Sequence, residues 1–164
     1  MEKPLSTRLP KFDQREVQEF LSQRHIAKIG TIGTDGFPHV APIWFIHENE
    51  QILMCTNDET VKIRNLRKNK NVCVLVDAAV GGLKIRGAMF QGHAEIIAGE
   101  EARKINRRIH VKYMGEDGLK DSRVSSYLAQ DTVTIKLAPK KTAYWDYFKI
   151  DFSEVPGMPL WPKG

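Results

Sequence analysis

The sequence predicts a mostly β domain with flanking helices, arranged as a small antiparallel barrel of six or seven strands. Apolar runs of strand length follow one another with short polar turns between them. Strands and helices do not alternate, as a parallel doubly wound sheet would require. Gly87 and Gly92 also interrupt the longest strand-like run, and glycines in such positions mark the sharp bends of small barrels.

The predicted domain begins with a helix. Residues 1–12 contain two prolines and are expected to form a flexible leader. Residues 13–25 have the pattern of an amphipathic helix, because Asp13 is a suitable N-cap and three apolar residues fall on one helical face. These three residues are Val17, Phe20 and Leu21.

Three strands are predicted to follow. Residues 27–32 form the first, and residues 33–36 form a hairpin turn, because their Asp-Gly pair supplies the positive φ angles that such a turn needs. The chain is expected to return through a strand at residues 38–46. After a polar turn at residues 47–51, the third strand ends at Cys55.

Pro42 lies inside the second of these strands. Proline has no backbone N–H to donate to a strand ladder, so it belongs at an edge, at a bulge or where the backbone turns toward another group. Two interpretations stay open at this point. One is a barrel bulge, which the sequence favours, and the other is a backbone shaped around a flat ligand.

The second half of the chain completes the predicted domain, which spans residues 13–150. Its nearly all-apolar first strand, residues 71–76, is expected to be covered on both faces. The other predicted elements are strands at 83–97, 132–137 and 142–148 and helices at 99–113 and 122–128. Pro139-Lys140-Lys141 separates the last two strands, and residues 151–164 are expected to form an extended, proline-rich tail.

Composition narrows the classes of function. The net charge of +5 suits an anionic ligand. Cys55 and Cys73 lie in apolar runs and are expected to be buried free thiols, and no Cys/His spacing indicates a metal site. No signal-peptide segment or membrane span is visible, so a cytoplasmic protein is expected, and no Walker or dinucleotide-binding glycine loop is present.

A basic segment follows the third strand directly. Five of the nine residues from Lys62 to Lys70 are Lys or Arg. Three interpretations compete for this segment: a solvated helix face, a nucleic-acid patch, or a pocket for one bound phosphate.

The junction before this segment has the groups that a phosphate needs. Thr56 offers a hydroxyl, Asn57 offers an amide, and Lys62, about one turn into the predicted helix, can direct its ammonium toward them. Asp58 and Glu59 would repel an anion, so both must point to solvent if the phosphate interpretation holds.

The order of motifs from residue 35 onward resembles the pyridoxamine 5'-phosphate oxidase-like superfamily, the flavin-binding split β-barrels. The resemblance covers residues 13–148. The matching motifs are the Asp35-Gly36 turn with Pro38, Pro42-x-Trp44-Phe45, Thr56-Asn57, Lys62, Arg64-Asn65-Leu66, Asn69-x-x-Val72 and the strand from Arg86 to Glu95.

This resemblance implies a homodimer that holds a flavin, FMN or alternatively a deazaflavin, at two sites between subunits. It places the cofactor phosphate at the junction described above and the flavin ring against the backbone of residues 42–44. Phosphate binding thus becomes the preferred interpretation of the basic segment. The predicted cofactor-binding residues are Pro42, Ile43, Trp44, Cys55, Thr56, Asn57, Lys62 and Asn65.

The chain also departs from the oxidases of this family. An arginine and a lysine that they carry on the strand matching residues 39–46 are missing, and Gly87 replaces a glutamine that contacts the flavin. Thr60-Val61 stands in place of a Ser-Arg pair, and the Arg-x-His that grips pyridoxal phosphate has no counterpart in residues 151–164. Oxidation of pyridoxamine phosphate is therefore not expected.

The predicted function is hydride or electron transfer from the flavin to a small organic acceptor. No catalytic residue is predicted, because the cofactor carries this chemistry. The alternatives are a deazaflavin-dependent reductase and a non-catalytic module that binds a cofactor, haem or nucleic acid. Nucleic-acid binding is disfavoured because Phe37, Trp44 and Phe45 crowd one strand, whereas the basic residues crowd two helices.

Overall fold

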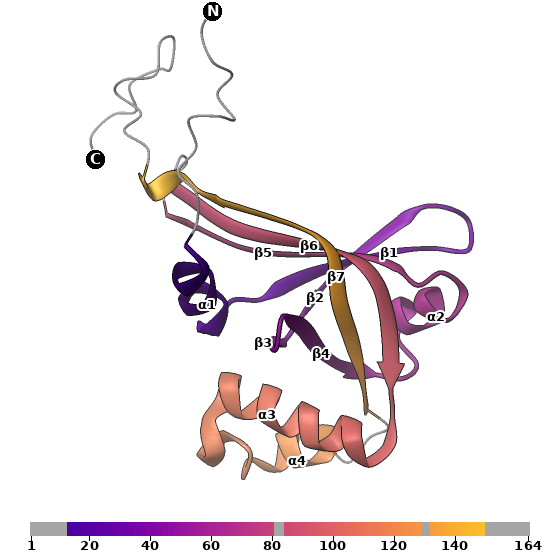
Figure 1. Cartoon of the computed structure of the whole chain (residues 1–164). Helices are drawn as coiled ribbons and strands as arrows, with labels where there is room; N and C mark the ends of the chain where they lie inside the picture. Colours follow the sequence, from indigo (N-terminus) through magenta and orange to yellow (C-terminus); the bar gives the residue numbers. More distant parts are fainter. Residues whose placement is uncertain (1–12, 81–83, 129–131, 150–164) are drawn as a thin grey trace, which may run out of the picture.

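The computed structural model describes residues 13–80, 84–128 and 132–149 (Figure 1). The leader predicted at 1–12 and the tail predicted at 151–164 lie outside these residues. Within the described part of the chain, no helix has both the length and the apolar character needed to span a membrane.

Seven strands form one antiparallel sheet in the order β2-β1-β5-β6-β7-β4-β3. The strands are β1 Ala27–Ile32, β2 Pro38–Ile43, β3 Phe45–Glu48, β4 Gln51–Asn57, β5 Asn71–Val80, β6 Lys84–Ile97 and β7 Thr132–Asp146. The long β6 and β7 run side by side and bend together (Figure 1). The prediction of a mostly β, antiparallel fold with six or seven strands is confirmed.

The bend in β6 and β7 coincides with a bulge, where the pairing shifts between Gln91 and Gly92. A Cβ atom at Gly92 would lie 3.0 Å from the carbonyl oxygen of Ala138, so glycine allows the two backbones to approach closely here. The two strands predicted on either side of Pro139 are in fact one strand, β7. That prediction was wrong because the bulge accommodates a proline without ending the strand.

Gly87, which the sequence marks as a second bend, has a different role. A Cβ atom at this position would overlap the ring of Trp145 on β7. The missing side chain therefore makes room for the indole of the neighbouring strand.

The helices are α1 Gln14–Ser22, α2 Val61–Lys68, α3 Gly99–Gly118 and α4 Ser122–Leu128, and a short 3-10 helix, η2 Tyr147–Lys149, follows β7. The helix α1 begins with a capping box between Asp13 and Glu16. Its three predicted apolar residues are buried. The helix α3 continues beyond the predicted end at residue 113, with a kink at Gly115, whose φ is 71°.

The core has two parts, which meet at β4. Ile52 and Met54 on one face of β4 pack in the main core, together with α1 and α2. Leu53 and Cys55 on its other face pack against α3. Residues 71–76 were predicted to be covered on both faces, but the strand that is buried on both faces is β4. In the single chain, Cys73 and Leu75 of β5 are only half-buried.

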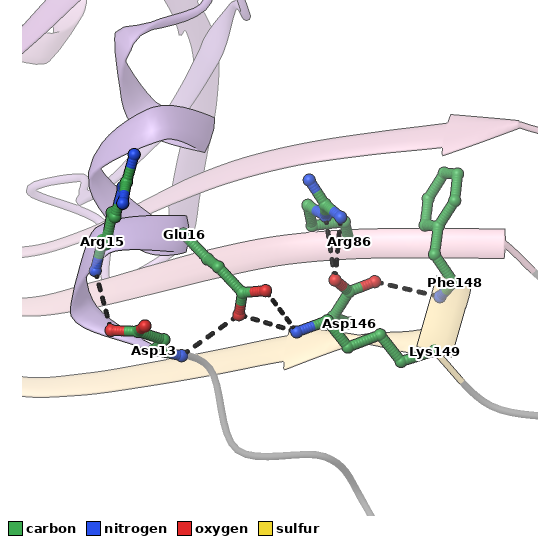
Figure 2. A network of polar contacts seen from close by, with 7 residues as sticks. All are labelled: Asp13, Arg15, Glu16, Arg86, Asp146, Phe148 and Lys149. Carbon is green, nitrogen blue, oxygen red and sulfur yellow. Dashed lines mark hydrogen bonds and ion pairs between the residues drawn. The ribbon is translucent and has the colours of Figure 1, made fainter.

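Polar contacts join the end of β7 to β6, and the 3-10 helix η2, which follows β7, to α1 (Figure 2). The carboxylate of Asp146, 1% exposed, accepts hydrogen bonds from Arg86 and from the backbone N–H of Phe148. Lys149 forms a hydrogen-bonded ion pair with Glu16 at the start of α1. The hydrogen bond from Lys149 lowers the pKa of the Glu16 carboxyl.

Lys112 of α3 connects three elements. Its ammonium donates hydrogen bonds to the carbonyl oxygens of Leu21 in α1, at 2.8 Å, and Phe45 in β3, at 3.2 Å. It also lies 4.0 Å from the centroid of the Phe45 ring. No carboxylate of the described residues lies within ion-pair distance of it, and burial lowers the pKa of Lys112 to about 8.

This depressed pKa predicts a specific pH dependence of stability. Between about 8 and the ordinary value of 10.5, Lys112 binds more protons in the unfolded chain than in the folded one. The contribution of Lys112 to the free energy of unfolding should therefore rise with pH through this window, against the opposing contributions of Cys55 and Tyr113, whose pKa values are raised by burial. We expect Lys112→Met to lose this contribution in urea titrations across the window, whereas Lys70→Met, at an exposed lysine, should retain it. The same pH profile in wild type and Lys112→Met would contradict the assignment.

Candidate functional site

A cavity of about 800 Å³ lies where the connection from β2 to β3, the junction from β4 to α2, and helices α3 and α4 meet. We call it the Trp44 cavity. Its size is typical of small-molecule sites. Seven of the eight predicted cofactor-binding residues line it: Pro42, Ile43, Trp44, Cys55, Thr56, Asn57 and Lys62.

Lys62 and Thr56 meet at the polar end of this cavity. The ammonium of Lys62 donates a hydrogen bond to the Thr56 hydroxyl at 3.2 Å. The hydroxyl of Thr60 lies 3.4 Å from that of Thr56 and donates to the Asn57 carbonyl at 3.0 Å. These contacts exist because β4 ends at Asn57 and α2 begins four residues later, so Lys62 lies in the first helical turn.

The charge at this end of the cavity is positive. Lys62 is half-buried, and burial lowers its pKa. Among the described residues, no carboxylate lies within ion-pair distance of its ammonium. Asp58 is instead paired with Arg67 at 2.6 Å, and Glu59 is exposed outside the cavity. Asp58 is thus ion-paired, although the sequence required it to point to solvent. Neither carboxylate lines the cavity, however, so neither opposes a phosphate there.

Two aromatic rings, those of Trp44 and His110, form an aromatic wall of the cavity. The ring of Trp44 stacks on Tyr113 of α3, with centroids 4.8 Å apart and an interplanar angle of 5°. His110, one helical turn earlier, meets the same ring edge-on at 5.6 Å. Tyr113 is not among the lining residues; it fixes Trp44 by stacking, and the Trp44 ring gives the cavity a flat surface that suits a planar ligand.

Hydrogen bonds hold the backbone on both sides of Trp44. The Trp44 carbonyl accepts from the N–H of Cys55 at 3.4 Å. The Phe45 N–H donates to the Tyr113 hydroxyl at 3.3 Å, and that hydroxyl in turn donates to the His25 carbonyl at 2.5 Å. The single strand predicted for residues 38–46 is thus two strands, which separate at Trp44.

Pro42 does not form a bulge. The pairing of β2 with β1 is continuous through Pro42 and Lys28, so the bulge interpretation is wrong. Pro42 is tolerated because β2 is an edge strand of the sheet, where one missing N–H breaks no ladder.

Six lining residues were not predicted: Ile26, Thr60, His110, Met114, Arg123 and Val124. His110 could have been found, because it continues the buried 3–4 spacing of α3 through Ile105, Asn106 and Ile109. Burial lowers its pKa, although a hydrogen bond with the Asn106 carbonyl opposes this effect. Arg123 and Val124 enter from α4, after a loop, and no local pattern indicates that they reach this site.

The structure also shows the contacts of Asn65 and the burial of Cys55, two of the predicted cofactor-binding residues. Asn65 lies outside the Trp44 cavity, where it is buried and donates to the Thr31 hydroxyl at 3.0 Å. Its contact with a cofactor stays a prediction.

Cys55 is a buried free thiol, and burial raises its pKa to about 12, so it stays protonated at neutral pH. In the part of the chain that is described, no three His, Cys, Asp or Glu side chains are grouped to hold a metal.

Comparison with solved structures supports the fold. A conserved hypothetical protein, Rv2991, from Mycobacterium tuberculosis superposes with a TM-score of 0.73 at 25% identity, covering 94% of this chain and 93% of its own. The haem storage protein HutZ from Vibrio cholerae has a TM-score of 0.66 at 17% identity, with coverages of 80% and 94%.

A third similar structure is described as an F420 reductase. It has a TM-score of 0.60 at 20% identity and covers 77% of this chain and 94% of its own. A comparison with curated protein sequences gave no match.

The family assignment comes from a model of protein families. The model for pyridoxamine 5'-phosphate oxidase matches residues 14–146, from the start of α1 to the end of β7. This match confirms the resemblance inferred from the sequence motifs. Because it covers most of the chain and every strand of the sheet, the chain belongs to the pyridoxamine 5'-phosphate oxidase family.

Proposed function

We propose that this protein is an oxidoreductase that binds FMN in the Trp44 cavity. The observation that carries the proposal is the ammonium of Lys62. It is half-buried, has no carboxylate partner among the described residues, and shares a hydrogen bond with Thr56 inside a largely apolar cavity. A phosphate at this position would satisfy the charge and both hydrogen-bonding groups.

The rest of the cavity fits a flat ring. Its lining includes residues 42–44, at the end of edge strand β2. One side of an edge-strand backbone has no partner strand, so its N–H and C=O groups are available to the polar edge of a ring. The stacked Trp44 and Tyr113 would shield the ring from water on the α3 side.

Flavin, when bound, supplies hydride or electron transfer by itself. The chain's residues would bind the phosphate, orient the ring and exclude water, and the protonated Cys55 is no nucleophile. Electron transfer to a small organic acceptor agrees with these roles. The absence of the Arg-x-His that grips pyridoxal phosphate argues against pyridoxamine phosphate as the substrate.

A deazaflavin is the alternative cofactor, because one of the similar structures is described as an F420 reductase. The phosphate contacts proposed for Lys62 and Thr56 apply equally to it. The visible absorption spectrum of the loaded protein separates the two cofactors. Haem is less well supported, because His110, a candidate axial ligand in the cavity lining, is 1% exposed and packs edge-on against Trp44.

We expect Lys62→Ala to weaken FMN binding about tenfold or more, because one charge-assisted contact with the phosphate is lost. The measurement is a titration that follows the quenching of FMN fluorescence. Lys70→Ala removes the same charge outside the cavity and should leave the affinity unchanged. Equal affinities of wild type and Lys62→Ala would remove Lys62 from the site.

We further propose that the protein is a homodimer. The outer face of the sheet carries Val40, which is 66% exposed, beside the half-buried Cys73 and Leu75. These residues line a second hollow of about 750 Å³. Such an apolar face suits a second copy of the chain, with a total buried area above roughly 1,200 Å².

Light scattering should therefore give a dimer at micromolar concentration. Val40→Glu should produce monomers, because it places a charge in the proposed interface, and it should also weaken FMN binding if the site is shared. Val80→Glu, at a similarly exposed valine outside this hollow, is the control and should remain dimeric. A wild-type monomer with bound cofactor would exclude the shared site.

The proposed reaction predicts selective turnover. Quinones or nitroaromatics should reoxidise the pre-reduced cofactor faster than oxygen does, because the aromatic wall favours flat substrates with little charge. Pyridoxamine phosphate should not be converted. Its efficient conversion to pyridoxal phosphate by the pure protein would overturn this part of the proposal.

A further inference from the structure

A different cavity lies on another side of α2. It has a volume of about 690 Å³ and is bounded by α2 and by the hairpin that joins β1 to β2, so we call it the hairpin cavity. Lys62 lines the Trp44 cavity, whereas Arg64 and Lys68 line the hairpin cavity. The basic segment of the sequence is therefore divided between two sites, and the proposed cofactor uses only one of them.

The hairpin cavity has an excess of positive charge. In the described part of the chain, no carboxylate lies within ion-pair distance of Arg64 or Lys68. Arg67 also lines the cavity, but it is paired with Asp58. The lining carboxylate, Asp35, accepts a hydrogen bond from the backbone N–H of Phe37 within the turn.

An aromatic ring and an unsatisfied polar atom accompany these cations. Phe37 lines the cavity and is 74% exposed, a high value for a phenyl ring. Nδ1 of His39, in the wall, has no hydrogen-bond partner among the described residues. This nitrogen is buried, and it could gain a hydrogen bond if the ring turned toward a polar ligand.

We propose that the hairpin cavity binds a nucleoside phosphate, with Arg64 and Lys68 at the phosphate and Phe37 against the base. Two unpaired cations beside an exposed aromatic ring match the two parts of such a ligand. Single-stranded nucleic acid fits less well, because its sites combine a long basic groove with several stacking rings. The described lining contains one such phenyl ring. This site is separate from the proposed cofactor site and does not depend on it.

The test is isothermal titration of the FMN-saturated protein with ADP and with pyrophosphate. Arg64→Ala/Lys68→Ala should weaken the binding of both about tenfold or more. The matched control, Lys70→Ala/Arg103→Ala, removes the same charge from exposed positions outside the cavity and should change affinity less than about twofold. Phe37→Ala should weaken ADP about fivefold but leave pyrophosphate unchanged, because only ADP has a base to stack.

Several results would overturn this proposal. One is a complete failure of the wild type to bind ADP. A second is a loss of affinity in the control double variant equal to that in Arg64→Ala/Lys68→Ala, and a third is normal ADP binding by Phe37→Ala. Loss of ADP binding in Lys62→Ala would place ADP in the Trp44 cavity instead. An oligonucleotide that competes with ADP and binds far more tightly would identify a nucleic-acid surface. Thermal unfolding of each variant confirms that these exposed substitutions leave the fold intact.

Discussion

The Tyr113 hydroxyl is the contact on which the shape of the site depends. It accepts the N–H of Phe45 and donates to the carbonyl of His25, so one side chain of α3 fixes the start of β3 and the segment before β1. Between the two edge strands, the chain passes through Trp44 alone. Because the Tyr113 ring also stacks on Trp44, the backbone break and the aromatic wall are held by one residue.

Helix α2 has a comparable role on the polar side. It follows β4 after three residues, and β4 is buried on both faces, so the first turn of the helix is rigidly placed. This placement brings Lys62 to Thr56. Later residues of the same helix turn away from the Trp44 cavity. A short basic helix can thus present separate charges to two cavities, and Asp58 neutralises Arg67, one of the cations that line the hairpin cavity.

Local chemistry in the sequence was sufficient to predict the Lys62 and Thr56 pair, because a strand end, a turn and one helical turn determine their distance. It was not sufficient for β7, which was predicted to be two strands. The register shift at Gly92 lets the strand continue through Pro139. Asn65 shares the helix with Lys62, yet its position in the turn directs it to Thr31 in the core. Arg123 and Val124 depend on how α4 packs after a loop, which no residue pattern indicates. Cys73 was predicted to be buried because it lies in an apolar run, but it is only half-buried in β5.

The central claim is that the unpaired charge of Lys62 marks the position of a cofactor phosphate. A crystal structure of the protein with FMN tests it most directly. The account predicts the phosphate within hydrogen-bond distance of the Lys62 ammonium and the Thr56 hydroxyl, and the ring along residues 42–44 beside Trp44. A phosphate bound at Arg64 and Lys68, with the Trp44 cavity empty, would contradict it.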